Sequence, residues 1–297
     1  MTGAWSRPEW PTILLALLIH AAWAALVWFH AAIPWWVFIP AAAIVSAWYG
    51  SLQHEIIHGH PTRSAAFNAV LAAPPLWLWL PFERYRDTHL QHHRDVRLTD
   101  PIDDPESRYW TQEAWVRLGP LGRAWVRAQT TLLGRMLLGP SWAIGRFLWT
   151  EARMPDRRTR RIWLRHGLLL APFLFWIFWI CAVPPWLYAL GFIQGGGALT
   201  MIRSYAEHRA AVDPARRTAV VENSSLLGPI FLFNNLHAAH HRWPAIPWYR
   251  LPERYRLERA ALLAENGGLV YRGYSEIFRR FLLNPHDQPL HPQGRAP

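Results

Sequence analysis

The sequence contains no lysine and a single cysteine, Cys181, and only 17% of its 297 residues are charged. One cysteine cannot form a disulfide within the chain, and it cannot supply the ligands of a cysteine-bound zinc ion or an iron–sulfur cluster. Apolar residues, in contrast, make up 52% of the chain, and 20 residues are tryptophan. This balance is unusual for a soluble domain and typical of a protein that lies in a bilayer.

Because lysine is absent, all 31 basic residues are arginines, and the net charge is +11. A basic protein can bind nucleic acid, but that function needs a basic face on a soluble fold or a recognition motif. The sequence contains neither, so we expect no nucleic-acid partner. Positive charge held at the cytoplasmic surface of a membrane explains the arginines instead.

Four apolar stretches are long enough to cross a bilayer, which takes roughly 20 residues of helix. They cover residues 11–29, 33–50, 166–183 and 185–205. Short links join the first to the second and the third to the fourth, so each pair is predicted to form a helical hairpin. The sequence therefore predicts an all-α integral membrane protein with four transmembrane helices.

Arginine also predicts the orientation. Between Arg84 and Arg165 there are 16 arginines, whereas the two hairpin links contain none. The positive-inside rule then predicts that this segment, the N-terminus and everything after Arg203 lie in the cytoplasm. We expect the membrane to be a bacterial inner membrane.

Three further segments are expected not to cross the membrane. Residues 67–82 are apolar but are interrupted by Pro74 and Pro75, so they are predicted to be re-entrant or interfacial. Residues 251–283 are predicted to form cytoplasmic amphipathic helices. The last stretch, "NPHDQPLHPQGRAP" (284–297), is predicted to be a disordered tail after a single domain of residues 1–283.

The 15 histidines are grouped rather than scattered. "HEIIHGH" contains His54, His58 and His60; "HLQHH" contains His89, His92 and His93; "HAAHH" contains His237, His240 and His241; and His208 lies in "RSYAEHRA". Each group lies at a predicted cytoplasmic helix end or just beyond it. The remaining histidines are expected to be structural: His20 and His166 hydrogen-bonded in apolar surroundings, His30 at an interface, and His286 and His291 in the tail.

The spacing of these groups favours metal binding. On a helix, residues i, i+3 and i+4 lie on one face, so H-x-x-H-H directs imidazoles toward a common point. Neutral imidazole is a good ligand for zinc, iron, copper and nickel. Nine or ten histidines exceed the needs of one tetrahedral zinc ion and suit two metal ions.

Two other kinds of protein remain as alternatives. His54, Glu55 and His58 match the H-E-x-x-H pattern of zinc metalloproteases, with Glu55 as the base. That reading leaves both H-x-x-H-H groups unexplained. A bis-histidine haem electron carrier would place its ligands within the spans, whereas these histidines lie at the ends of the spans.

Together, "HEIIHGH", "HLQHH" and "HAAHH" resemble the three histidine boxes of the membrane fatty acid desaturase family, a superfamily that includes alkane hydroxylases and carotenoid ketolases and hydroxylases. "SYAEHRA" is similar to the extra-histidine segment that precedes the third box. The resemblance covers roughly residues 36–255. It implies four transmembrane helices under a cytoplasmic helical cap that holds two iron ions.

Carried over motif by motif, the resemblance implies a set of iron ligands. They are His54, His58, His89, His92, His93, His208, His237, His240 and His241. His60 extends the first box and its role as a ligand is open, while Glu55 has at most an indirect role beside the metal. Asn234 and Asn235 precede the third box and are candidates for hydrogen bonds near the metals.

The segment "RDVRLTDPIDDPESRYW", which follows the second box, has two possible roles. Its acidic residues are Asp100, Asp103, Asp104 and Glu106. They form either a solvated loop or a group of carboxylates that orient ligand histidines or dock an electron donor.

The resemblance implies an oxidoreductase that uses O2 and two iron ions (Fe2+/Fe3+) to oxidise an unactivated C–H bond of a lipid acyl chain. The expected reaction is fatty acid desaturation; lipid or alkane hydroxylation and carotenoid ketolation are the alternatives. No iron–sulfur or cytochrome b5-like module is present in the sequence, so we expect an external electron donor of ferredoxin, rubredoxin or cytochrome b5 type, together with its reductase.

Overall fold

The computed structural model describes residues 8–93, 95–153 and 156–292. These residues form two compact units. Of the described residues, those within 8–86 and 140–200 belong to the first unit, and those within 87–139 and 201–292 belong to the second unit. Three helices, α4 (Phe82–His92), α7 (Leu132–Ala152) and α10 (Gly196–Glu207), have residues in both units.

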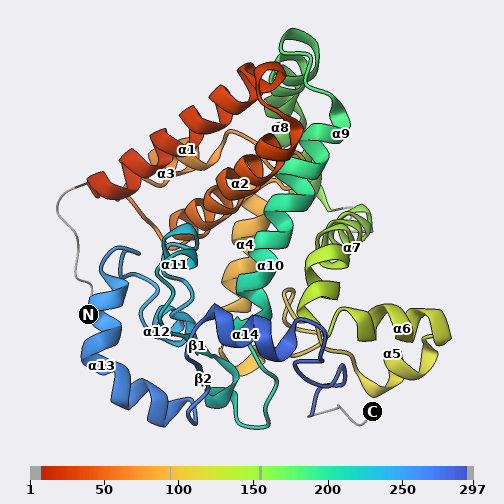
Figure 1. Cartoon of the computed structure of the whole chain (residues 1–297), viewed down its shortest axis with the longest axis vertical. Coiled ribbons are helices and arrows are strands. Elements are labelled where there is room, and N and C mark those ends of the chain that lie inside the picture. The colour runs from red at the N-terminus through yellow and green to blue at the C-terminus, as the bar shows by residue number, and fades with distance from the viewer. Residues whose placement is uncertain (1–7, 94, 154–155, 293–297) are drawn as a thin grey trace. The chain divides into compact units, whose positions relative to one another are not determined.

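Long apolar helices dominate the first unit, where α1 and α2 lie side by side (Figure 1). Its other elements are the short helices α3 and α9 and the long helix α8, which continues into a π-helical segment. Their bounds are α1 Trp10–Trp28, α2 Trp35–Ile57, α3 Ala65–Ala72, α8 Arg157–Phe175, π-helical Trp176–Ile180 and α9 Pro185–Tyr188.

Among the described residues, three helices are long and apolar enough to cross a membrane: Trp10–Trp28, Trp35–Ile57 and Arg157–Ile180. They match the first three predicted spans. The fourth predicted span, 185–205, is helical as well, but it is divided among α9, a π-helical segment at Ala189–Gly195 and α10. Residues 67–82 contain only the short helix α3 and then irregular chain up to α4.

Close packing holds α2 against the π-helical segment Ala189–Gly195 and the start of α10. Gly191 faces Ala42, and Gly196 faces the side chain of Ser46. Small residues at such contacts let helix backbones approach closely, which is the usual basis of packing between membrane helices. Ser46 Oγ also donates to the Phe192 carbonyl over 2.6 Å.

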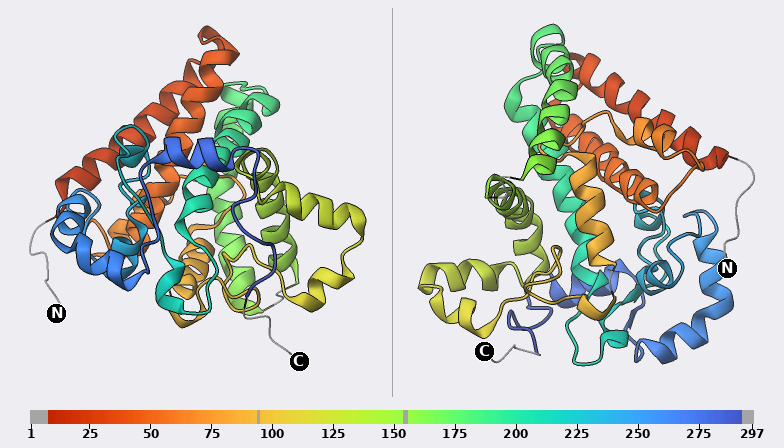
Figure 2. Two further views of the ribbon diagram at one scale, coloured as in Figure 1. Left: turned by 60° about the horizontal axis from the view of Figure 1, so that its bottom comes forward. Right: turned by 180° about the vertical axis from the view of Figure 1, so that it is seen from behind.

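Shorter helices and connecting loops make up the second unit, and Figure 2 shows its helices α5 and α6 side by side. The remaining elements are α5 Gln112–Arg117, α6 Pro120–Ala128, α11 Leu227–Ile230, α12 His237–Arg242, α13 Leu251–Glu265, α14 Tyr274–Phe281, β1 Val220–Val221 and β2 Val270–Tyr271. The two strands pair in parallel, Val220 with Val270 and Val221 with Tyr271. The prediction of an all-α fold did not include this two-residue ladder, and residues 251–283 are mainly helical, as expected.

An apolar core fixes α12, the helix of the third histidine box. Ala239 of α12 is buried together with Val220 of β1 and with Leu251, Tyr255 and Leu262 of α13. The Ala238 amide also donates to the Ala219 carbonyl over 3.0 Å. Burial of this apolar surface therefore holds the histidine-bearing helix to the strand and to α13.

The prediction of a disordered tail is wrong for residues 284–292. His286 and His291 are buried, and the His286 amide donates to the Thr130 carbonyl over 2.9 Å. Proline-rich composition suggested disorder, but contacts with residues far away in the sequence order this segment. The predicted tail residues 293–297 lie outside the described part of the chain.

Candidate metal centre

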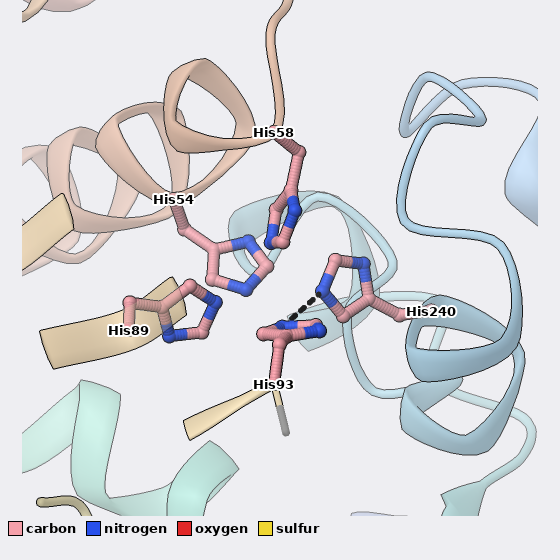
Figure 3. A group of neighbouring side chains, drawn as sticks. All are labelled: His54, His58, His89, His93 and His240. Atoms are coloured by element: carbon pink, nitrogen blue, oxygen red, sulfur yellow. Dashed lines mark hydrogen bonds between the residues drawn. The ribbon is translucent and has the colours of Figure 1, made fainter. Parts of the chain in front are cut away.

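The first histidine box lies at the end of α2. His54 is in the last turn of this helix and buried, and His58 is the residue that ends it. The two rings approach edge to face with their centroids 5.0 Å apart (Figure 3). The four-residue spacing therefore brings two imidazoles together at the end of an apolar helix, as the sequence predicted.

In the second unit, three imidazoles from the second and third boxes converge. His89 lies on α4, His93 directly follows α4, and His240 lies on α12. The His93 and His240 Nε2 atoms are 3.3 Å apart (Figure 3), and the rings of His89 and His93 have their centroids 4.6 Å apart. Each of the three residues offers a nitrogen within 4.8 Å of the others.

A second set of four imidazoles lies wholly in the second unit, and we call it the four-histidine set: His92, His208, His237 and His241. The Nε2 atom of His208 is 3.0 Å from that of His92 and 2.9 Å from that of His237. His241 Nε2 is 3.1 Å from His237 Nε2. The second box, the lone histidine and the third box thus contribute to one group.

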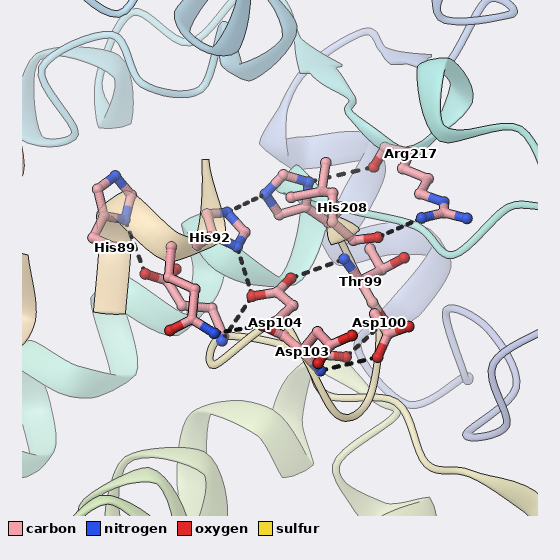
Figure 4. A network of polar contacts seen from close by, with 12 residues as sticks. His89, His92, Thr99, Asp100, Asp103, Asp104, His208 and Arg217 are labelled. Atoms are coloured by element: carbon pink, nitrogen blue, oxygen red, sulfur yellow. Dashed lines mark hydrogen bonds and ion pairs between the residues drawn. The ribbon is translucent and has the colours of Figure 1, made fainter. Parts of the chain in front are cut away.

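The other ring nitrogen of three of these histidines faces an acceptor. His92 Nδ1 is 2.9 Å from an Asp104 carboxylate oxygen, and His237 Nδ1 is 3.0 Å from the Asn234 amide oxygen. His208 Nδ1 is 3.4 Å from the Arg217 carbonyl (Figure 4). Each acceptor favours the tautomer that carries its proton on Nδ1, because only a protonated nitrogen can donate. The Nε2 atoms that face one another are then lone-pair donors.

This donor set fits a metal ion. Lone pairs that face one another at 2.9–3.1 Å repel unless a cation lies among them. Two imidazole nitrogens that bind one ion at about 2.1 Å and at a right angle are about 3.0 Å apart, which agrees with these separations. Imidazole nitrogen suits iron, zinc, copper and nickel, so the donors alone do not select among these metals.

The electrostatics also favour neutral ligands. Burial, and then the neighbouring histidines, hold the pKa values of His208 and His237 well below the ordinary value. Burial lowers the pKa of His89 as well, and Glu106 only partly offsets this effect. These three rings therefore carry no proton on their second nitrogen at neutral pH, the form that binds metals.

His92 behaves differently from the other rings. Burial alone would lower its pKa, but Glu106 and Asp104 outweigh that effect and raise the pKa to about 9. These carboxylates stabilise a positive charge on or beside the ring, whether it is a proton or a metal ion. Carboxylate–histidine pairs of this kind are common around protein-bound metals.

The acidic loop after the second box therefore contacts the histidines. Glu106 lies 2.9 Å from His89 Nδ1, and Asp104 has the same distance to His92 Nδ1. Asp104 also accepts from the backbone amides of Thr99 and Glu106, at 2.8 and 2.9 Å (Figure 4). Of the two roles considered for this loop, the geometry favours orientation of histidines by Asp104 and Glu106. Asp103 instead pairs with Arg97 at the surface.

His60, the open case in the first box, contacts two carboxylates. Its Nδ1 atom lies 2.7 Å from Glu9, and its Nε2 atom lies 3.8 Å from Glu55. All three side chains are buried, and they are close enough to hold a cation. However, 2.7 Å is a hydrogen-bond distance and is shorter than the roughly 3 Å between two ligand atoms that share a metal. We therefore assign His60 and Glu9 to an ion pair that joins the start of α1 to the end of α2.

The structure also shows the contacts of the two asparagines before the third box and of two histidines that were expected to be structural. Asn234 contacts His237, whereas Asn235 donates to the Val221 carbonyl and so fixes the backbone before α12. His20 and His166 contact the carbonyls of Leu71 and Leu78, in agreement with their predicted structural role.

Two charged residues beside the four-histidine set had no role in the predictions from the sequence. Glu207 has a carboxylate oxygen 3.3 Å from His237 Nδ1 and 3.2 Å from Arg203. In the sequence, Glu207 could have been found from its position next to His208 in "AEHR". Arg108 donates to the His208 carbonyl over 3.0 Å, and no local pattern singles it out.

Comparison with known proteins agrees with this centre. The model of the fatty acid desaturase family matches residues 31–275. The chain belongs to this family. The match contains all four histidine segments, and the family consists of oxidoreductase-type enzymes of lipid acyl chains that work at membranes and use two iron ions. No curated protein matches the chain.

Proposed function

We propose that this desaturase family member oxidises an unactivated C–H bond of a lipid acyl chain with O2, and that its reaction is desaturation. The observation that carries the proposal is the four-histidine set, whose Nε2 atoms face one another while acceptors hold the Nδ1 protons. Such a donor set suits a redox metal, and the family uses iron.

We further propose that nine histidines hold two iron ions. One ion takes His89, His93 and His240, which converge in the second unit, and the histidine boxes of the family imply His54 and His58 as iron ligands as well. The other takes the four-histidine set. The convergence of rings within each unit supports this division. His60 has no part in it, because it groups with Glu9 and Glu55 rather than with the other histidines.

Bound iron would supply the reduction of O2 and the removal of two hydrogens from adjacent carbons. The chain's own residues prepare the site. Asp104 and Asn234 hold the Nδ1 protons, so that His92 and His237 present their Nε2 lone pairs. His89, His92, His237 and His240 are buried, so little water reaches the centre and side reactions of the oxidant are suppressed.

The proposal includes the membrane arrangement. Residues 185–205 form a fourth span beside the three candidate spans, and the termini and the histidines lie on the cytoplasmic side of the membrane. The arginine distribution and the exposed leucines of α1, such as Leu14 and Leu17, support this arrangement. An acyl chain could then reach the centre directly from the bilayer.

Two electrons must come from outside the chain in each turnover. A single cysteine excludes an iron–sulfur carrier within the chain. We therefore propose an external donor of ferredoxin, rubredoxin or cytochrome b5 type with its reductase. The arginines on the cytoplasmic side would attract an acidic donor.

Metal analysis and lipid analysis test this function together. We expect about two iron ions per purified chain, and about one fewer in the His240→Ala variant, because only one of the two ions takes His240. In a bacterial host that expresses the gene, we expect a new double bond in the membrane lipids that the variant does not produce. A product that gains one oxygen would instead identify a hydroxylase, and a shift in carotenoid colour would identify a ketolase. Stoichiometric zinc with peptidase activity, or a haem absorption band, would refute the proposal.

A further inference from the structure

The C-terminal segment 284–292 is bound to the loop that follows the second histidine box. The Trp110 amide donates to the Pro289 carbonyl over 2.9 Å, and the His291 amide donates to the Trp110 carbonyl over 3.1 Å. All of these residues belong to the second unit. The segment therefore lies along the loop that carries Asp104 and Glu106.

One series of contacts connects this segment to His208. Asp287 accepts from Arg108 over 3.0 Å, and the hydroxyl of Tyr109 donates to the same carboxylate. Arg108 in turn donates to the carbonyls of His208 and Tyr205, at 3.0 and 2.8 Å. These carbonyls lie at the end of α10, where helix geometry leaves acceptors without partners. Asp287 thus holds the guanidinium that fixes the backbone of His208.

A second series of contacts connects this segment to His92. His291 Nε2 lies 3.1 Å from Thr99 Oγ1, and the Thr99 amide donates to Asp104 over 2.8 Å. The other oxygen of Asp104 lies 2.9 Å from His92 Nδ1 (Figure 4). Through two intermediates, His291 is connected to the orientation of the His92 ring.

Both series of contacts end within the four-histidine set, one at the backbone of His208 and the other at the ring of His92, and the Nε2 atoms of these two residues are 3.0 Å apart. We infer that the segment 284–292 positions His92 and His208 through Asp287 and His291, and so controls the metal affinity of this set. Asp287 and His291 are positioning residues, since neither contacts the centre. The inference rests on the proposed function, because that function supplies the metal.

The inference predicts an effect on one metal site only. Substitutions that disturb the support of a metal ligand commonly weaken binding by about 10- to 100-fold. In a titration of the metal-free, full-length protein with Co2+, we expect two binding steps for the wild type. Asp287→Asn should weaken one of them by about tenfold or more and change the Co2+ visible spectrum of that step. The other step should stay as in the wild type.

Matched variants separate positioning from general damage. Asp287→Glu keeps the charge and should restore most of the affinity, whereas Glu113→Gln removes a carboxylate from an exposed ion pair and should have no effect. His291→Leu should weaken the same step as Asp287→Asn.

Equal weakening of both steps, or unchanged affinity in Asp287→Asn, would overturn the inference. A wild-type protein that binds fewer than two Co2+ ions would instead refute the proposed function, so the two failures are distinguishable.

Discussion

At the scale of single residues, the centre depends on which nitrogen of each imidazole carries the proton. Asp104 and Asn234 each accept from an Nδ1 atom, so the Nε2 atom of the same ring is left to bind metal. The sequence of a histidine box does not show which ring nitrogen carries the proton, because this depends on the acceptors that surround each ring. The acceptors are therefore as informative about the chemistry as the histidines themselves.

Asp104→Asn should weaken metal binding by the four-histidine set. The variant removes the negative charge beside His92 and allows the amide to rotate so that its NH2 group faces Nδ1. We expect a loss of about 10- to 100-fold in Co2+ affinity at one step of a titration. Asp103→Asn is the matched control, since Asp103 pairs with Arg97 at the surface. Equal losses in both variants would contradict a specific role for Asp104.

Asp287 should make the stability of the protein sensitive to acid. Burial alone would raise its pKa, but Arg108, His286 and Tyr109 together outweigh burial and hold the pKa of this carboxyl well below its ordinary value. A depressed folded pKa contributes stability that is complete above the unfolded value, about 3.9, and is lost as the pH falls toward the folded pKa. Below about pH 4, the wild type should therefore lose free energy of unfolding faster than Asp287→Asn does.

Thermal unfolding in detergent between pH 3 and pH 7 measures this difference. At pH 7, Asp287→Asn should be less stable by roughly 3 kcal/mol, because it leaves the buried Arg108 guanidinium without its charged partner. Glu113→Gln, which is exposed, should follow the wild type at every pH. If the stabilities of Asp287→Asn and the wild type changed with pH in parallel, the ion pair of Asp287 with Arg108 would not contribute to the pH dependence of stability.

At the scale of elements, the spacing of the boxes and the packing of the helices act together. His237 and His241 lie four residues apart on α12 and belong to one set, whereas His240 belongs with His89 and His93. A short helix can serve two groups of ligands only if its position is fixed, and the contacts of α12 with β1 and α13 supply that fixation.

Gly196→Ala should destabilise the first unit. A Cβ atom at this position would overlap the Ser46 side chain on α2, so the two helices would have to separate. Overpacking of this kind costs about 1–3 kcal/mol. Gly167→Ala is the matched control, because a Cβ atom there meets nothing within 4 Å. Thermal unfolding of both variants should show a loss only for Gly196→Ala; a similar loss in both would point to a general helix effect.

At the scale of the whole molecule, the orientation in the membrane decides where substrate and electron donor approach. The single native cysteine makes this testable by labelling. In a Cys181→Ala background, His30→Cys should react with a membrane-impermeant maleimide in intact cells. Arg216→Cys should react only after the membrane is permeabilised. The reverse pattern would invert the proposed topology.

The sequence by itself determined the helical class, the first three apolar spans and the grouping of the histidines. These features follow from composition and from helical periodicity, which act over a few neighbouring residues. His54 and His58 approach each other because they are one turn apart on α2, and this could be predicted from the letters. The same reasoning brought three histidines together in each H-x-x-H-H group, but it could not divide them between two sets.

Only the tertiary structure decided that division, the Nδ1 acceptors and the order of the C-terminal segment. His92 meets His208 from 116 residues away, and Arg108 meets Asp287 across 179 residues. No local pattern specifies a contact at such separations, because it depends on how the intervening elements pack. For the same reason, "NPHDQPLHP" has the composition of a disordered tail and is nevertheless ordered: buried partners from distant segments provide the contacts that offset its loss of conformational entropy.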